Sequence, residues 1–161
     1  RQYKEITIDT RVGELFEWMR NEIPGMMLQS VQALQNNADY VLEVQSLNPS
    51  DALRTYPRLP EDGKIDWKKS NEEVVRLINA SSEPFAGAYC EFNNEKMLIW
   101  RAQVFDDAEN YSAVAGQVAK IDADGVVIIT GNGKIKITDV EMNGKRELAV
   151  CFIKSIRSRL K

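Results

Sequence analysis

The chain has 161 residues, of which 43% are hydrophobic and 28% charged, and its net charge is −3. Such a chain can bury a core without disulfides or a structural metal. The sequence contains no histidine, which excludes histidine-based triads, metal sites and general bases within this chain. No long apolar run indicates a membrane span, and the polar first residues do not resemble a signal peptide.

The first 45 residues predict a short strand followed by a long helix. Residues 3–8 alternate weakly, as a strand does, and apolar side chains then recur at helical spacing from Val12 to Leu34. Pro24-Gly25 interrupts this helix, and we expect a kink or a break into two helices there, because proline lacks the backbone donor. Residues 40–45 predict a second short strand.

A segment rich in structure-breaking residues follows. Residues 46–64 contain three of the five prolines and are typical of a linker. The charge balance also changes here, since residues 1–53 carry 4 basic and 8 acidic side chains and residues 54–161 carry the other 17 and 16. We therefore expect two domains, comprising residues 1–53 and 54–161.

The second domain has the pattern of a small β-structure with short helices. Ser70 and Glu73 form a capping box that predicts the start of a helix ending before Pro84. Five short strands are then predicted at residues 87–92, 96–105, 117–121, 126–130 and 134–140, and a short helix near 148–156. This spacing is typical of a small barrel or sandwich, so the expected class is α+β.

The side chains offer little catalytic chemistry. Gly131-Asn132-Gly133 joins two strands and is typical of a turn, not a phosphate loop, and Asp122 and Asp124 lack the glutamate of a calcium loop. No metal site is predicted. Trp67 and Trp100 are expected in the core. Two interpretations stay open for the basic residues near the end, a solvated surface or contact with RNA phosphates: Lys145, Arg146, Lys154, Arg157, Arg159 and Lys161.

The two cysteines, Cys90 and Cys151, lie in separate apolar stretches and form no C-x-x-C pair. Because free cysteines in apolar surroundings are usually buried and reduced, we expect two buried thiols in a cytoplasmic protein.

The segment from Tyr56 to Trp67 resembles the interdomain segment of folate-dependent formyltransferases, which include methionyl-tRNA formyltransferases and sugar N-formyltransferases. The resemblance continues through residues 84–88, 99–102, 116–118 and 130–133. It implies that residues 54–161 are the family's C-terminal OB-like barrel. Residues 1–45 are similar to the last strands and helix of the family's α/β catalytic domain, and would be a strand-helix remnant of it.

The resemblance also implies what this chain does not contain. The family's catalytic asparagine, histidine and aspartate would lie before residue 1, together with the folate pocket. We therefore expect a fragment that is inactive alone, with no catalytic, cofactor-binding or metal-binding residue of its own. Its partner would be the missing N-terminal catalytic domain, and the full-length enzyme would use 10-formyltetrahydrofolate.

The acidic net charge and the form of the linker favour the amine of a nucleotide-linked amino sugar as the substrate. Methionyl-tRNA, contacted by the barrel, is the alternative, and a noncatalytic interaction module is a hypothesis of another class. A homodimer is also considered. Tyr56 and Arg58 are the candidate substrate-binding residues, for stacking on a base and for binding phosphate. The structural alternative is that Arg58 pairs with Glu61 or Asp62 and Tyr56 packs on the barrel.

Overall fold

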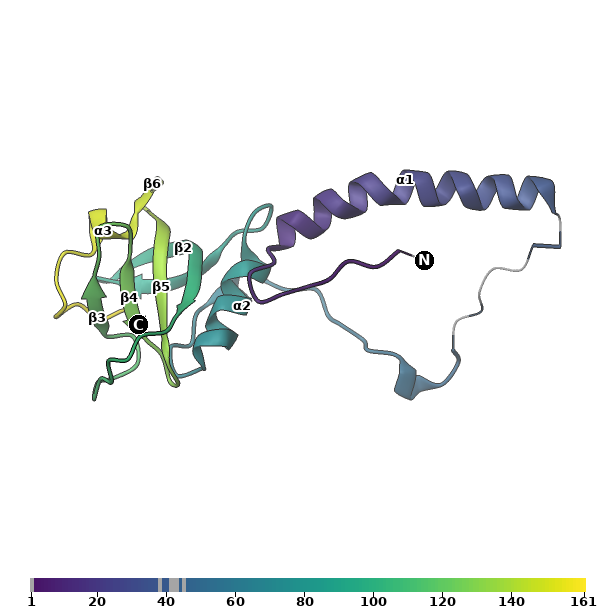
Figure 1. Ribbon diagram of the computed structural model, residues 1–161. Helices are drawn as coiled ribbons and strands as arrows, with labels where there is room; N and C mark the ends of the chain where they lie inside the picture. Colours follow the sequence, from purple (N-terminus) through teal and green to yellow (C-terminus); the bar gives the residue numbers. More distant parts are fainter. Residues whose placement is uncertain (1, 38, 41–43, 45) are drawn as a thin grey trace.

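The computed structural model describes residues 2–37, 39–40, 44 and 46–161. A long helix, α1 (Val12–Asn36), stands away from a compact domain made of an antiparallel sheet and short helices (Figure 1). The chain is thus α+β, with a small β-sheet domain, as its sequence predicts. No helix in the described part of the chain is long and apolar enough to cross a membrane.

The N-terminal region differs from the sequence prediction in two ways. Residues 3–8 form no strand, because no other strand lies beside them to complete a ladder of hydrogen bonds. Helix α1 continues through Pro24 as one element. Of the two predicted outcomes, a kink or a break into two helices, the break is therefore wrong. The predicted strand at residues 40–45 falls mostly outside the described residues.

All residues of α1 are described, and none of them is buried. Several large apolar side chains at helical spacing are exposed by about two fifths or more, and they form what we call the apolar face of α1: Phe16, Ile23, Met27, Val31 and Leu34. The predicted helix therefore forms, but its apolar side packs against little else in this chain.

The linker is extended and exposed. Described residues from 46 to 62 are all exposed. The linker contains two short 3₁₀ helices, η1 (Pro49–Asp51) and η2 (Pro60–Gly63), and only Gly63 at the end of η2 is buried. Beyond them, Ser70 caps α2 (Asn71–Ser81): its Oγ accepts a hydrogen bond from the Glu73 amide at 3.2 Å, and its own amide donates to the Glu73 carboxylate at 3.0 Å. The predicted capping box is confirmed.

The sheet has six antiparallel strands: β1 (Ala88–Phe92), β2 (Glu95–Phe105), β3 (Val118–Ile121), β4 (Val126–Ile129), β5 (Lys134–Met142) and β6 (Lys145–Leu148). Their order is β1-β2-β5-β4-β3, with β6 also paired to β5. The five predicted strands are confirmed, whereas β6 was missed because Lys-Arg-Glu-Leu has no apolar alternation. The last helix, α3 (Ala149–Phe152), is shorter than predicted.

Residues 158–161, which we call the closing segment, bridge the two outer strands of the sheet, and we use the word barrel for the sheet together with this segment. On one side the Val118 amide donates to the Ser158 carbonyl at 3.1 Å and the Leu160 amide to the Gly116 carbonyl at 2.8 Å. On the other side Lys161 and Glu91 exchange two backbone hydrogen bonds of 2.8 and 2.9 Å. Because this segment bonds both outer strands, neither β1 nor β3 is left as an open edge.

The core lies between the barrel strands and α2. Trp67 and Trp100 are buried, as predicted, and so is Cys90. Cys151 is exposed, which corrects the prediction of two buried thiols. The reason is local: Ala149 turns inward from α3, and a residue two positions later on a helix points to nearly the opposite side.

Candidate functional site

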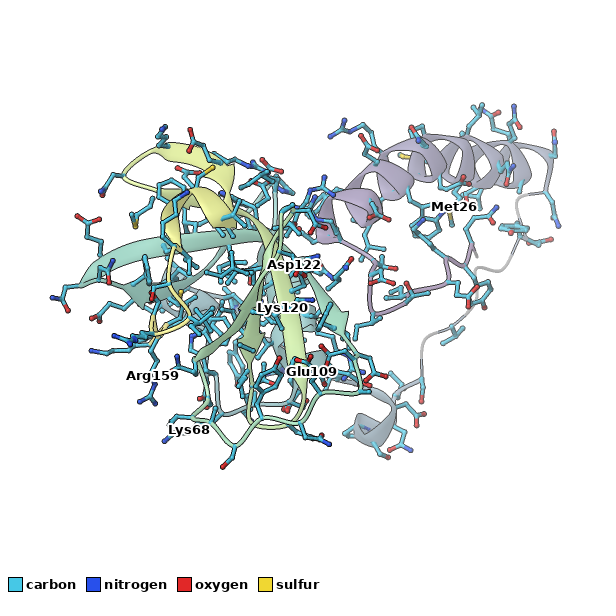
Figure 2. The ribbon with its side chains drawn as sticks, turned by 60° about the vertical axis from the view of Figure 1, so that its left-hand side comes forward. Met26, Lys68, Glu109, Lys120, Asp122 and Arg159 are labelled. Carbon is cyan, nitrogen blue, oxygen red and sulfur yellow. The ribbon has the colours of Figure 1, made fainter. Side chains whose placement is uncertain are left out.

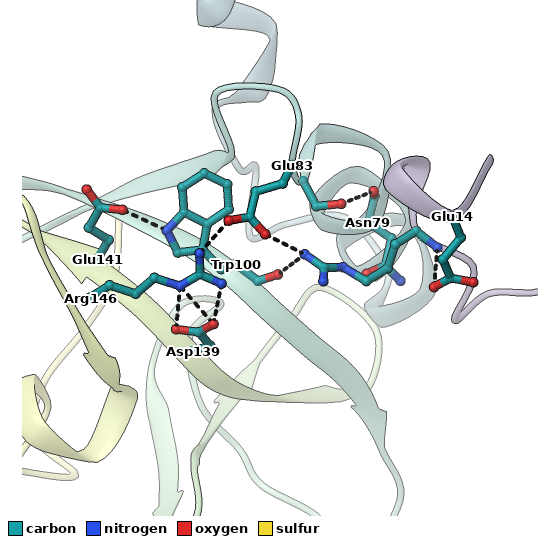
Figure 3. Close-up of polar contacts among 9 residues, drawn as sticks. Glu14, Asn79, Glu83, Trp100, Asp139, Glu141 and Arg146 are labelled. Carbon is teal, nitrogen blue, oxygen red and sulfur yellow. Dashed lines mark hydrogen bonds and ion pairs between the residues drawn. The ribbon is translucent and has the colours of Figure 1, made fainter. Parts of the chain in front are cut away.

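Charged side chains fasten the start of α1 to the barrel (Figure 3). The Arg146 guanidinium lies across the Asp139 carboxylate, with Nη2–Oδ2 at 2.6 Å and Nε–Oδ1 at 3.1 Å, and its Nη1 donates to Glu83 at 2.6 Å. The same guanidinium lies 5.0 Å from the centroid of the Trp100 ring. Arg11, at the N-cap of α1, donates to the Trp100 carbonyl at 3.2 Å and lies 4.0 Å from Glu83.

These contacts have electrostatic consequences. The hydrogen bonds to Asp139 and, secondarily, Glu83 raise the pKa of Arg146 above its ordinary value, although partial burial opposes this. Burial and the nearby Arg101 lower the pKa of Arg11. Four side chains form what we call the charged junction between α1 and the barrel: Arg11, Glu83, Asp139 and Arg146. Guanidinium groups and carboxylates alternate along it.

Two further contacts support the charged junction. The Asn79 side chain on α2 donates to the Ile8 carbonyl at 2.8 Å. Phe16 on α1 meets Phe85 edge-to-face, with ring centroids 5.8 Å apart. The start of α1 and the residues just before it are thus held by three parts of the chain: α2, the loop before β1, and β2.

The two residues predicted to bind substrate lie on the exposed linker. The Tyr56 side chain is 81% exposed and does not pack on the barrel. The Arg58 guanidinium donates to the backbone carbonyl of Asp62 at 2.8 Å, so its contact is with the backbone and not with the carboxylate. That carboxylate instead accepts a hydrogen bond from the Leu59 amide at 2.7 Å. A substrate-binding role for Tyr56 and Arg58 stays a prediction.

Arg58 also borders a cavity of about 340 Å³ between the linker, the end of α2 and the loop before β1. We call it the linker cavity, and its main walls are Arg58, Leu59, Pro60, Ala80, Ser81 and Phe85. Ser81 is buried, and its Oγ finds no hydrogen-bond partner among the described residues. The accessible lining of the cavity is therefore mostly apolar, with one guanidinium at its edge.

A second, wider depression of about 690 Å³ lies where the linker meets the closing segment of the barrel. We call it the basic groove, and its charged and aromatic lining residues are Lys64, Asp66, Trp67, Lys68, Arg159 and Lys161. Figure 2 shows Lys68 and Arg159 directed outward at the same end of the barrel. Four cationic side chains against one carboxylate make this groove suited to an anionic ligand.

The basic residues near the end of the sequence do not act together. Arg146 is engaged in the charged junction, and Lys145 pairs with Glu147 at 2.8 Å. Only Arg159 and Lys161 of that set line the basic groove. Some of these cations are therefore paired, and two others line the basic groove. Contact with RNA phosphates stays a prediction.

The linker cavity and the basic groove are suited to binding a ligand and not to catalysing a reaction on it. In the described part of the chain, no three His, Cys, Asp or Glu residues are grouped to hold a metal ion. Burial raises the pKa of the Cys90 thiol to about 12, so this cysteine stays protonated at neutral pH. The groove and the cavity present cations and apolar walls.

The chain thus combines a small antiparallel sheet domain that carries this groove with an exposed linker and a projecting helix. Residues 59–157, more than half of the chain, match the family described as formyl transferase, C-terminal domain. The chain belongs to this family, as its linker and strand sequences indicate.

Methionyl-tRNA formyltransferases are among the relatives of this chain. That of Acetivibrio thermocellus is 26% identical over 148 residues, which are 91% of this chain and 45% of the relative. That of Lactococcus lactis subsp. cremoris is 26% identical over 156 residues, 94% of this chain and 47% of the relative. The chain therefore spans just under half the length of these relatives.

The fold is also similar to a solved structure, HypX from Aquifex aeolicus in complex with tetrahydrofolic acid. The TM-score is 0.66 at 17% identity, over 95% of this chain and 26% of that one. This likeness supports the α+β fold.

Several residues of the site escaped the sequence analysis. Ser81 follows an ordinary helix pattern, and Asp139 and Glu83 are separated by more than fifty residues from each other. The basic groove joins the linker to the last residues of the chain. The only local sequence signal for the basic groove is a short cluster of lysines beside the aromatic residue Trp67.

Proposed function

We propose that this chain is the C-terminal part of a 10-formyltetrahydrofolate-dependent N-formyltransferase and binds the substrate that receives the formyl group. The comparisons with methionyl-tRNA formyltransferases favour methionyl-tRNA over an amino-sugar nucleotide, reversing the preference drawn from sequence alone. The observation that carries the proposal is the basic groove, because a positively charged surface is what a polyanion such as tRNA requires.

The groove fits contact with a nucleic-acid backbone better than base recognition. Its cations come from two separate segments of the chain, residues 64–68 and residues 159–161. Trp67 is buried, which excludes its ring as an open platform for stacking bases. Its Nε1 is also buried and lacks a hydrogen-bond partner among the described residues.

The residues present do not fit a site for the folate itself. The sequence has no histidine to match the catalytic set that the family resemblance implies, and the groove and the cavity pair no general base with an enclosed polar cradle. We therefore derive no formyl-transfer step within this chain. Its own residues bind and orient.

Substitution of Lys68 and Arg159 tests the proposal. Lys68→Ala and Arg159→Ala should each weaken binding of initiator tRNA and reduce the slope of log affinity against log salt by about 1, because each removes one phosphate contact. Lys154→Ala, which removes an exposed lysine outside the groove, is the matched control. Unchanged affinity and slope in both groove variants would contradict the proposal.

An amino-sugar nucleotide is the second candidate substrate, and the observation that favours it is Arg58, whose guanidinium contacts a backbone carbonyl. If Arg58 binds the diphosphate, Arg58→Ala should weaken sugar-nucleotide binding by about 1.5–3 kcal/mol without loss of thermal stability. Arg54→Ala, four residues earlier on the same exposed segment, should have no effect. Equal affinities in the two variants would leave Arg58 with a structural role only.

A further inference from the structure

We propose that the linker cavity is a binding site for a small ligand that combines a planar aromatic ring with an anionic group. The site does not share a lining residue with the basic groove, so it is independent of the tRNA proposal. Two observations carry it: the apolar walls of the cavity and the cation of Arg58 at its edge.

The size and the walls of the cavity suit an aromatic ring. Its volume of about 340 Å³ lies at the lower end of the roughly 300–1,000 Å³ found for small-molecule sites. Phe85 forms one wall and is 51% exposed, and its ring makes an edge-to-face contact with the ring of Phe16. An aromatic side chain that is both fixed and half-exposed favours contact with another flat ring. Leu59 and Pro60 supply further apolar surface.

Arg58 supplies the cation at the edge of the cavity. Its guanidinium is oriented by the Asp62 carbonyl, while the Asp62 carboxylate is occupied by the Leu59 amide. No ion pair among the described residues includes Arg58, so its charge is oriented but not neutralised. An oriented, unpaired guanidinium is suited to a carboxylate or a phosphate, which it binds through two parallel hydrogen bonds.

Two sources of ligand share this chemistry, a nucleoside monophosphate and an aromatic carboxylate. Both can be tested by nuclear magnetic resonance titration of the 161-residue chain with uridine monophosphate and with phenylacetate. We expect at least one of them to shift the amide signals of Ser81, Ala86 and Gly87. Uridine alone and inorganic phosphate alone should bind at least about tenfold more weakly, because each lacks half of the recognised chemistry.

Variants identify the groups responsible. Arg58→Met should weaken binding of the better probe by at least about tenfold, and Arg54→Met should not change it. Ala80→Leu, which fills the cavity from an exposed helix position, should abolish binding and leave the fold intact.

The proposal is overturned if neither probe shifts these amides, if the neutral ring binds as tightly as the anionic one, or if Arg58→Met binds like the unmodified chain. Shifts confined to residues around Lys68 and Arg159 would also overturn it, since the probes would then be anions held by the basic groove. Lys68→Ala should leave probe binding unchanged. Loss of tRNA binding in that variant therefore tests the proposed function separately from the linker cavity.

Discussion

Arg146 connects more parts of the structure than any neighbouring charged residue on β6. Its guanidinium contacts Asp139 on β5 and Glu83 in the loop before β1, and it lies over the Trp100 ring on β2. Through Glu83 it is linked to Arg11 at the start of α1. The orientation of the helix relative to the barrel therefore depends on Arg146. From sequence alone, this residue was one of a basic set with two open interpretations, a solvated surface or contact with RNA phosphates.

Replacing Arg146 should destabilise the domain. Arg146→Met should lower the free energy of unfolding by about 1–2 kcal/mol, because it removes a bidentate pair at a partly exposed site, leaving Asp139 without its cation and Glu83 with only the more distant Arg11. Denaturant titration measures the change. Lys145→Met removes a single, largely exposed pair with Glu147 and should cost less than about 0.5 kcal/mol. Equal effects of the two substitutions would contradict a special role for Arg146.

At the scale of elements, the closing segment depends on the close approach of two backbones. Gly116 has φ of +86°, and a Cβ built on it would lie 2.1 Å from the Leu160 carbonyl oxygen. A side chain at this position would therefore force the segment away from the edge strand to which it is bonded. The barrel can close here only because residue 116 is glycine.

Gly116→Ala should consequently destabilise the barrel by about 3–5 kcal/mol, since backbone strain and a steric clash add together. Gly144→Ala is the matched control, because that residue also has a positive φ, +75°, but nothing lies within 4 Å of its added Cβ. It should cost only about 1–2 kcal/mol of strain. Thermal and denaturant unfolding of both variants measure the difference, and similar losses would show that the contact with Leu160 is unimportant.

Helix α1 is an element whose stability is separate from that of the barrel. Its interior proline lacks one backbone hydrogen bond, and no residue of this fully described helix is buried. Pro24→Ala should slow amide hydrogen exchange over residues 26–36 by about tenfold or more, given a helix-propensity gain of about 3 kcal/mol. The unfolding temperature of the barrel should not change. A rise in that temperature would show that α1 and the barrel unfold together.

The whole molecule presents an unusual surface, because the apolar face of α1 is uncovered. Ile23 is 54% exposed, Met27 67% and Leu34 43%. Soluble monomers rarely expose a continuous apolar strip, and such strips usually mark an interaction site. In the proposed full-length enzyme this face would be covered by the catalytic domain.

The isolated chain should therefore self-associate. Sedimentation velocity over a range of concentrations should show dimers or larger species, and the combined change Ile23→Gln and Met27→Gln should return it to monomers. Leu53→Gln, which removes an apolar side chain that is 90% exposed but lies in the linker, should have no effect. A chain that stays monomeric at every concentration would contradict the expectation.

The chain alone should also have no formyltransferase activity. The expected reason is the absence of histidine, together with the absence of a site that fits folate in the described residues. Release of tetrahydrofolate from 10-formyltetrahydrofolate, with amino-sugar nucleotides or methionyl-tRNA as acceptor, measures this. Any turnover above buffer by the pure chain would refute it.

The sequence by itself determined the local elements and the family. Apolar runs, alternating or unbroken, and the turn residues between them predicted five of the six strands. Ser70 with Glu73 predicted the start of α2, because such signals arise from neighbours within a few residues. The order of short motifs around the linker identified the family correctly. The boundary at residues 53 and 54 and the OB-type topology stay predictions, as does the role of Tyr56.

Tertiary structure decided everything that depends on residues far apart in the chain. Strand β6 exists because β5 supplies its hydrogen-bond partners, and Cys151 is exposed because α3 directs Ala149 inward instead. The basic groove, the linker cavity and the closure of the barrel each join segments separated by about twenty to one hundred residues. No local pattern records such contacts, since they form only when folding brings those segments together.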